Sequence, residues 1–409
     1  MRVSGEVDPM FRSFRIGSLF GIPLKLDVTF LLILPIFAWV IAVQIEDLVG
    51  LLNLSLGLTM DPEPLVTGWN PWILGAVAAI GLFTSVVLHE LGHSLTAIRF
   101  GFPIHSITLW LLGGVAQLEE QPTDWREELI IAIAGPIVSV ALGVGFWLAV
   151  YVIPAAMEGL LFLVSYLAVM NIILAAFNML PGFPMDGGRV LRALLARNQP
   201  FAVATAQAAQ VGKLFAIGLG FLGLIALNFI MIALALFIYI AAAGEARYTA
   251  LQSAVEGIKV EDIMTPVRNL EVVRPEMSVD DLLERMFEQR HTGYPVVDAD
   301  HVVGVVALDD VRGVPSEDRY RIRVADIMTR DLATISPHGD AIDAIEELQR
   351  RNIGRLVVLD DRGQLVGLVT RTDIVRALSI GALRSPGGEP SIGAGSVDAV
   401  GSTSGRPRW

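Results

Sequence analysis

Two histidines and a glutamate lie within five consecutive residues of this 409-residue chain, in the stretch His89-Glu90-Leu91-Gly92-His93. Residues four apart in a helix share one face, so both imidazoles could bind one metal ion and Glu90 could reach a water on it. This H-E-x-x-H pattern is typical of zinc-dependent hydrolysis. Here it lies in an apolar run, 77–98, where ionisable side chains are costly unless they are paired or bound to metal.

A second stretch supplies a candidate third ligand. Residues 178–189 read NMLPGFPMDGGR, and their prolines and glycines predict irregular backbone at the end of an apolar helix. A catalytic zinc site needs three protein ligands and an open fourth position, and Asp186 is the acid expected at the depth of His93. Asp186 could instead cap the next helix. Asn178 could cap the end of the preceding helix.

The apolar content of 53% is too high for an ordinary soluble protein, and the absence of cysteine excludes disulfides and thiolate zinc ligands. Stretches of about 20 apolar residues are long enough to cross a bilayer. The segment 47–72 is expected to be an exposed polar loop. The predicted spans cover residues 28–46, 73–99, 128–153, 159–180 and a run over 211–243 that is divided at Asn228 into two.

Two β-hairpins are predicted beside these spans, over residues 17–26 and 104–118. The free edge of the second could accept an extended peptide as an added strand. Six spans put both chain ends on one side, and the Lys and Arg residues near the spans fall on that side. The positive-inside rule then places both termini in the cytoplasm. Counted from Arg99, His93 would lie about 9 Å inside the cytoplasmic interface.

From residue 258 the composition becomes that of a soluble α/β module with an internal repeat. The sequence VEDIMT at 260–265 recurs as VADIMT at 324–329, and each copy closes with an apolar strand and a helix start. We expect one copy over 258–312, a second over 323–381, and a disordered tail over 384–409. The net charge of −12 is shared by both halves, so neither resembles a nucleic-acid-binding surface.

With these motifs identified, about residues 15–250 resemble the site-2 protease family of intramembrane zinc metalloproteases, which implies a membrane-embedded metalloprotease domain over 1–250. The pentapeptide 89–93 matches the family's first motif, and residues 178–187 match its Asn, Pro, Pro, Asp-Gly motif. The resemblance implies one zinc ion held by His89, His93 and Asp186, with Glu90 as the general base. It also implies Asn178 as a candidate for holding the substrate or the oxyanion. Ser139 departs from the family, in which many members have Asn after Gly-Pro.

The repeat resembles a tandem pair of CBS domains, which a branch of this family carries after its last span. Such pairs are known as sensors of adenosyl ligands or nucleotides. Thr370 and Asp373 stand where CBS relatives hold a ribose, whereas the first copy has Ala307 and Asp310 and lacks the hydroxyl. The resemblance therefore implies an adenine nucleotide chiefly at the second copy. The alternative is a dimerisation module without a ligand.

These features predict a polytopic α-helical membrane domain of about six spans, with small β-hairpins at the cytoplasmic side, followed by a soluble α/β tandem CBS pair. The predicted activity is intramembrane zinc-dependent hydrolysis of a peptide bond within or near the transmembrane segment of single-span membrane proteins. We expect regulation by an adenine nucleotide and association of two chains through the CBS pair.

Two other functions stay open at this point. A CBS-gated metal or ion transporter would need polar residues across its spans, and these are almost wholly apolar beyond the midplane. A non-catalytic scaffold with a structural zinc would need a fourth protein ligand.

Overall fold

A computed structural model describes residues 13–110, 113–118, 122, 124–299 and 301–376. The chain divides into two compact units, which meet in sequence at Ala250 and Leu251. The tail predicted over 384–409 lies outside the described residues. The first unit contains long apolar helices and shorter connecting ones: α1 (Val28–Val43), α2 (Ile45–Leu56), α3 (Glu63–Val66), α4 (Asn70–Arg99), α5 (Trp125–Val150), α6 (Glu158–Asn178), α7 (Asp186–Ala196), α8 (Phe201–Ile225) and α9 (Phe229–Val255), whose last residues belong to the second unit.

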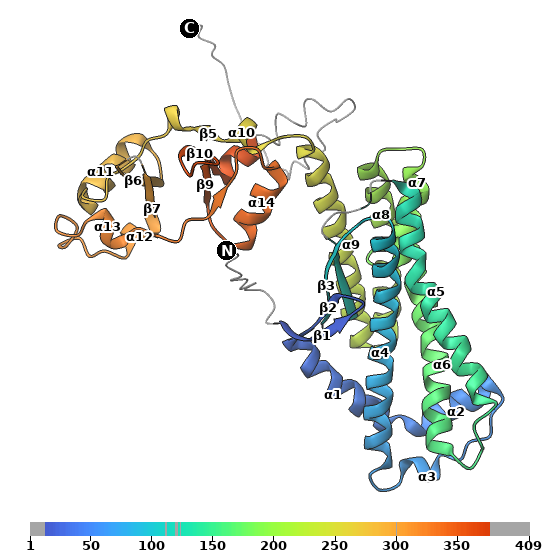
Figure 1. Ribbon diagram of the computed structural model, residues 1–409. Helices are drawn as coiled ribbons and strands as arrows, with labels where there is room; N and C mark the ends of the chain where they lie inside the picture. Colours follow the sequence, from blue (N-terminus) through green and yellow to red (C-terminus); the bar gives the residue numbers. More distant parts are fainter. Residues whose placement is uncertain (1–12, 111–112, 119–121, 123, 300, 377–409) are drawn as a thin grey trace, which may run out of the picture. The chain divides into compact units, whose positions relative to one another are not determined.

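The helices α4, α5 and α6 pack against one another along their lengths (Figure 1). Among the described residues, five helices are long and apolar enough to cross a membrane, and a sixth crossing results if α1 and α2 count as one bent span. The predicted polytopic helical domain is thus confirmed. Aspartates begin two of these helices, because Asp27 accepts a hydrogen bond from Thr29 N (2.8 Å) and Asp124 accepts one from Arg126 N (2.7 Å).

The segment after the first span differs from the expected polar loop. α1 ends at Val43, and the chain bends by 71° into α2. Ile45, Val49 and Leu52 are buried in a core that α4 and α6 complete. Their spacing of four and three residues gives α2 one apolar face, while its acidic residues face outward. The prediction of a loop was wrong over residues 47–56 because it weighed the acidic side chains above this periodicity.

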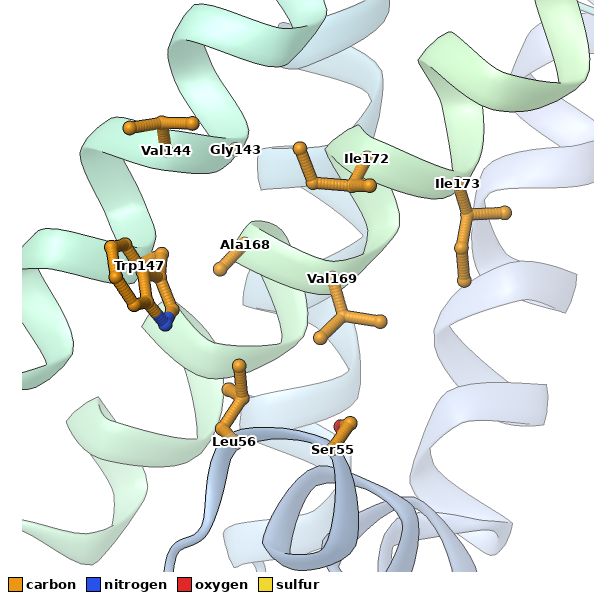
Figure 2. Close-up of a pocket in the computed structure, with 9 residues that line it drawn as sticks. All are labelled: Ser55, Leu56, Gly143, Val144, Trp147, Ala168, Val169, Ile172 and Ile173. Atoms are coloured by element: carbon orange, nitrogen blue, oxygen red, sulfur yellow. The ribbon is translucent and has the colours of Figure 1, made fainter.

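An apolar groove of about 340 Å³ lies among α2, α5 and α6 (Figure 2). Leu56 of α2, Gly143 and Trp147 of α5, and Ile172 of α6 are among the residues that line it. None of the metal-binding candidates lines this groove. It is a hollow of helix packing and is separate from the chemistry considered below.

The two predicted hairpins join into a single four-stranded sheet with the order β1-β2-β3-β4. Each hairpin is antiparallel, and β2 pairs in parallel with β3. Ile22 and Ile107 of this sheet pack against Leu91 of α4, so the sheet lies directly on the helix that carries the pentapeptide. Among the described strands, β4 forms an edge. The strands are β1 (Ser13–Leu19), β2 (Ile22–Asp27), β3 (Ile104–Trp110) and β4 (Gly113–Leu118).

The second unit is α/β, as predicted. Its helical segments are α10 (Val260–Ile263), the 3-10 turn η1 (Val267–Asn269), α11 (Val279–Gln289), α12 (Leu308–Arg312), α13 (Val324–Ile327) and α14 (Ala341–Arg350). Its strands are β5 (Thr265–Pro266), β6 (Gly293–Asp298), β7 (His301–Ala307), β8 (Thr334–Ile335), β9 (Arg355–Leu359) and β10 (Leu365–Thr370).

The two sequence repeats exchange their first segments. β5 begins at the last residue of the VEDIMT motif of the first repeat and pairs with β10 of the second repeat. Thr329, which ends the VADIMT motif of the second repeat, pairs with Val305 of the first repeat. The pairing leaves no room for side chains at two glycines, because a Cβ at Gly304 or Gly367 would meet the sulfur of Met328 or Met264. The repeats are therefore interlocked within one unit.

Candidate metal centre

The structure brings together three side chains of the predicted site from two helices. His89 and His93 lie one turn apart on the same face of α4, and Asp186 is the first residue of α7. Asp186 Oδ2 lies 3.0 Å from His89 Nε2 and 3.2 Å from His93 Nε2, and the two Nε2 atoms are 3.2 Å apart. Both histidines are buried. The result is a compact group of two nitrogen donors and one oxygen donor.

Asp186 reaches this group because the loop before it folds tightly on itself. A Cβ on Gly187 would overlap the backbone of Met179 and Leu180, and one on Gly188 would overlap that of Gly182. Only glycine allows such a close approach. The N-cap of α7 is Met185, so the alternative in which Asp186 merely caps the helix does not describe its position.

The far nitrogens of both imidazoles are held by α5. His93 Nδ1 donates to the carbonyl of Ile131 (2.7 Å), and His89 Nδ1 lies 2.9 Å from Ser139 Oγ. Because a carbonyl can only accept, His93 carries its proton on Nδ1 when neutral and presents the Nε2 lone pair to the group. That lone pair and the Asp186 carboxylate both face the same buried point, which suits a cation. Such outer contacts are the usual way in which metal-binding histidines are oriented.

The donor set fits zinc. Imidazole nitrogen and carboxylate oxygen are common zinc ligands, and three protein ligands with one open position describe a catalytic site. In the described part of the chain, no fourth His, Cys, Asp or Glu completes the group. A closed structural site is therefore not formed by these residues.

Two glycines leave room for the reacting side chains. Gly135 of α5 lies against the His93 ring, and an added Cβ would fall on that imidazole. Gly114 of β4 lies against Glu90, where a Cβ would come within 2.5 Å of Glu90 Cγ and 3.3 Å of Cδ. The edge strand of the sheet therefore starts beside the carboxylate of the pentapeptide.

Three other predicted residues lie outside this group. Asn178 is the last residue of α6 and is half-buried. Thr370 and Asp373 are in the second unit, where Asp373 Oδ2 accepts hydrogen bonds from Thr370 N (3.0 Å) and Thr370 Oγ1 (2.6 Å). This contact is the arrangement of a helix N-cap. The first copy retains half of it, because Asp310 Oδ2 accepts from Ala307 N.

The analysis of sequence missed the part that α5 and β4 contribute. Ser139 was recognised only as a departure from the family pattern, and no contact with the metal site was expected for Gly135, Gly114 or the Ile131 carbonyl. α5 is apolar on every side, so its periodicity does not reveal which face meets α4. The signal available in the sequence for the face of α5 that meets the site was Gly135-Pro136 and Ser139 inside an apolar span.

Removal of the Ser139 hydroxyl tests its contact with His89. We expect Ser139→Ala to weaken zinc binding by about 10- to 100-fold, because the His89 ring loses the hydrogen bond that orients it. Competition with a chelator on the purified protein measures the change. Ser94→Ala is the matched control, since Ser94 is equally buried on α4 and its hydroxyl has no partner among the described residues. Equal zinc affinity of the two variants would contradict the role of Ser139.

Comparison with known families matches both units of the chain. The model of peptidase family M50 matches residues 77–155 and 149–219. The CBS domain model matches residues 260–317 and 324–380. The first match contains the pentapeptide and the loop with Asp186, and the second contains both sequence repeats.

Similar proteins extend over nearly the whole chain. A zinc metalloprotease of Methanocaldococcus jannaschii is 34% identical, over 90% of this chain and 96% of that protein. The protein Rip3 of Mycobacterium tuberculosis, named as a zinc metalloprotease, is 31% identical over 94% of this chain and 97% of its own length. The solved site-2 protease of M. jannaschii is 34% identical, covers 57% of this chain and 95% of that chain, and gives a TM-score of 0.40.

Proposed function

The chain belongs to peptidase family M50, the site-2 protease family of zinc metalloproteases, and we propose that it hydrolyses a peptide bond within or near the transmembrane segment of membrane-protein substrates. The observation that carries this proposal is the convergence of His89, His93 and Asp186 on one point. The two histidines and Glu90 belong to α4, a helix apolar enough to cross a membrane. The family assignment favours this enzyme over a metal or ion transporter.

In the proposed mechanism His89, His93 and Asp186 hold the zinc ion. When bound, zinc supplies a Lewis acid that polarises the scissile carbonyl and lowers the pKa of water. Glu90 accepts a proton from the attacking water as its oxygen bonds to the carbonyl carbon, and returns that proton to the leaving amine nitrogen when the C–N bond breaks. Asn178, eight residues before Asp186, is the candidate for holding the substrate or its oxyanion.

The substrate must be extended at the site, because the peptide bonds of an intact helix are hydrogen-bonded and shielded. The edge strand β4 could hold the substrate in this extended form, since its main chain passes beside Glu90 at Gly114. A substrate segment that pairs with β4 would gain main-chain hydrogen bonds that replace those lost on unwinding. Register on β4 would then select the bond that meets Glu90.

Mapping the cleavage position tests the proposed function. The full-length protein is placed in lipid vesicles with a single-span substrate, and the product termini are determined by mass spectrometry. We expect new termini within or a few residues from the span, loss of cleavage with a zinc chelator, and recovery with added zinc. A substrate with the same flanks but a soluble helix in place of the span is the control. Equal cleavage of both substrates in the flanks would refute intramembrane proteolysis.

The contact between β4 and Glu90 gives a sharper expectation. Gly114→Ala should lower the cleavage rate by about 100-fold, because displacement of a catalytic group by about 1 Å has an effect of that size. Zinc affinity should stay unchanged, since Glu90 is not among the proposed ligands. Gly17→Ala in β1 is the control, as no atom lies within 4 Å of an added Cβ there. Wild-type activity of Gly114→Ala would show that the edge strand does not constrain Glu90.

We also propose that the CBS pair regulates the protease by binding an adenine nucleotide at its second copy. Thr370 and Asp373 support this site, because a hydroxyl and a carboxylate side by side suit the hydroxyls of a ribose. In this structure the same two groups cap a helix, so binding would compete with that cap. Calorimetry should detect ATP or AMP binding to the wild type, with at least about tenfold weaker binding to Asp373→Ala. Equal affinity of the two proteins would remove this assignment.

The helices and the family identify a multi-pass membrane protein. Placement of both termini in the cytoplasm is proposed from the distribution of Lys and Arg in the sequence. Association of two chains through the CBS pair stays a prediction, which the molecular mass of the detergent-solubilised protein would test.

A further inference from the structure

A buried ionic cluster joins three helices of the first unit at a distance from the reacting groups. Arg192 of α7 is 3% exposed and binds two carboxylates, Glu128 of α5 and Glu245 of α9. Its Nε donates to Glu128 Oε1 (2.7 Å) and its Nη1 donates to Glu245 Oε1 (2.8 Å). The second oxygen of Glu128 is buried with no partner among the described residues. Ionisable groups placed among apolar helices at such a cost usually serve function.

Arg192 is also fixed by aromatic rings. Its guanidinium lies 4.9 Å from the ring centre of Phe183 and 4.6 Å from that of Phe201. Contacts with two rings and two carboxylates restrict the orientation of the guanidinium, because it is planar and its donors form a rigid fork. Arg192 therefore anchors α7 to α5, α8 and α9 together.

This anchor brackets Asp186 along the chain. Phe183 lies three residues before Asp186 and Arg192 six residues after it, and these two side chains are in contact. The loop before Asp186 and the first turns of α7 after it are therefore linked to each other by this contact. Movement of Asp186 relative to α4 would require the contacts of Arg192 to change.

The two carboxylate partners of Arg192 are not equally buried. The Glu128 side chain is 1% exposed, whereas that of Glu245 is 32% exposed. Glu245 stands on α9, which continues without a break to Val255, and Val255 packs in the core of the second unit. A rotation of α9 about its axis would move Glu245 away from Arg192 and leave the Glu128 contact in place.

We infer that Arg192 is a positioning residue for Asp186, and that Glu245 makes this positioning depend on the setting of α9. The inference rests on the proposed role of Asp186 as a zinc ligand. It assigns to α9 a way of adjusting the metal centre that needs no direct contact with the histidines.

Zinc affinity of the purified full-length protein, measured by chelator competition, tests this inference. Arg192→Met should weaken zinc binding by about 10- to 100-fold, as loss of outer contacts does at other zinc sites. Arg192→Lys should fall between this variant and wild type, because lysine keeps the charge without the fork. Glu245→Gln should have a smaller effect of at least about threefold. Arg197→Met is the control, as Arg197 is the exposed C-cap of the same helix.

The double variant Arg192→Met/Glu245→Gln should bind zinc no more weakly than Arg192→Met alone, because both changes remove one contact. Melting temperatures identify any variant that does not fold, in which case Arg192→Lys and Glu245→Gln carry the test. Zinc affinity within twofold of wild type in folded Arg192 variants would overturn the positioning role. An unchanged Glu245→Gln, or multiplied losses in the double variant, would overturn the dependence on α9.

The Asp186→Asn variant separates this inference from the proposed function. If Asp186→Asn loses zinc and the Arg192 variants do not, the zinc site stands and the positioning role fails. If Asp186→Asn keeps wild-type zinc affinity, the ligand assignment itself is wrong and the inference falls with it.

Discussion

Glu90→Gln is expected to lower the rate of peptide-bond cleavage by about 10²- to 10⁴-fold, the range that a general base contributes. Glutamine has the shape of glutamate and fits beside Gly114, but its amide cannot accept the proton of the attacking water. Zinc content should equal that of the wild type, because His89, His93 and Asp186 are unchanged. Single-turnover cleavage of a single-span substrate, together with metal analysis, measures both quantities.

The control for this experiment is a carboxylate remote from the centre. Glu158→Gln changes the first residue of α6 in the same chemical way and should cleave at the wild-type rate. If Glu90→Gln with its zinc retained also cleaved at that rate, Glu90 would not be the base. If it lost zinc, the separation of ligand and base roles would be wrong.

Gly135→Ala is expected to weaken zinc binding by more than about 100-fold and to abolish cleavage. The added methyl group would occupy the place of the His93 ring, and its three nearest atoms would be Nε2, Cδ2 and Cε1. Since Nε2 is the proposed donor atom, the ring must turn away or α5 must move from α4. Either change separates His93 from Asp186, an effect at least as large as the loss of an outer contact.

A matched glycine on the same helix separates this steric effect from the general effect of alanine. Gly145 of α5 has no atom within 4 Å of an added Cβ. Gly145→Ala should therefore keep zinc affinity and activity, with a small gain in helix stability. Chelator competition and circular dichroism on both variants make the comparison. Normal zinc binding by Gly135→Ala would show that α5 does not confine His93.

Much of the architecture was predictable because it depends on local pattern. Length and composition of the apolar runs indicated the membrane helices, and a recurring VxDIMT motif indicated two copies of one module. The segment 47–56 was misjudged because a short amphipathic helix with acidic residues resembles a polar loop in composition. Its apolar periodicity only has meaning once α4 and α6 are there to cover it.

The sequence did not reveal how separate segments pair. The two hairpins of the first unit combine through β2 and β3, which are about 80 residues apart in the chain. The two repeats of the second unit exchange their first segments, an arrangement that an internal repeat alone does not indicate. Nor did it show that Glu128, Arg192 and Glu245 meet, since each comes from a different helix.

The sequence by itself determined the pair His89 and His93 and the nearby Glu90, because a spacing of four residues in a helix fixes which side chains share a face. It also indicated Asp186, through a loop that proline and glycine prevent from being helical. Only the tertiary structure decided what surrounds them: Ser139 and the Ile131 carbonyl behind the imidazoles, and Gly135 and Gly114 against the reacting groups. The reason is physical, since a helix that is apolar on every side does not encode its own rotation, and the facing surface is set by packing.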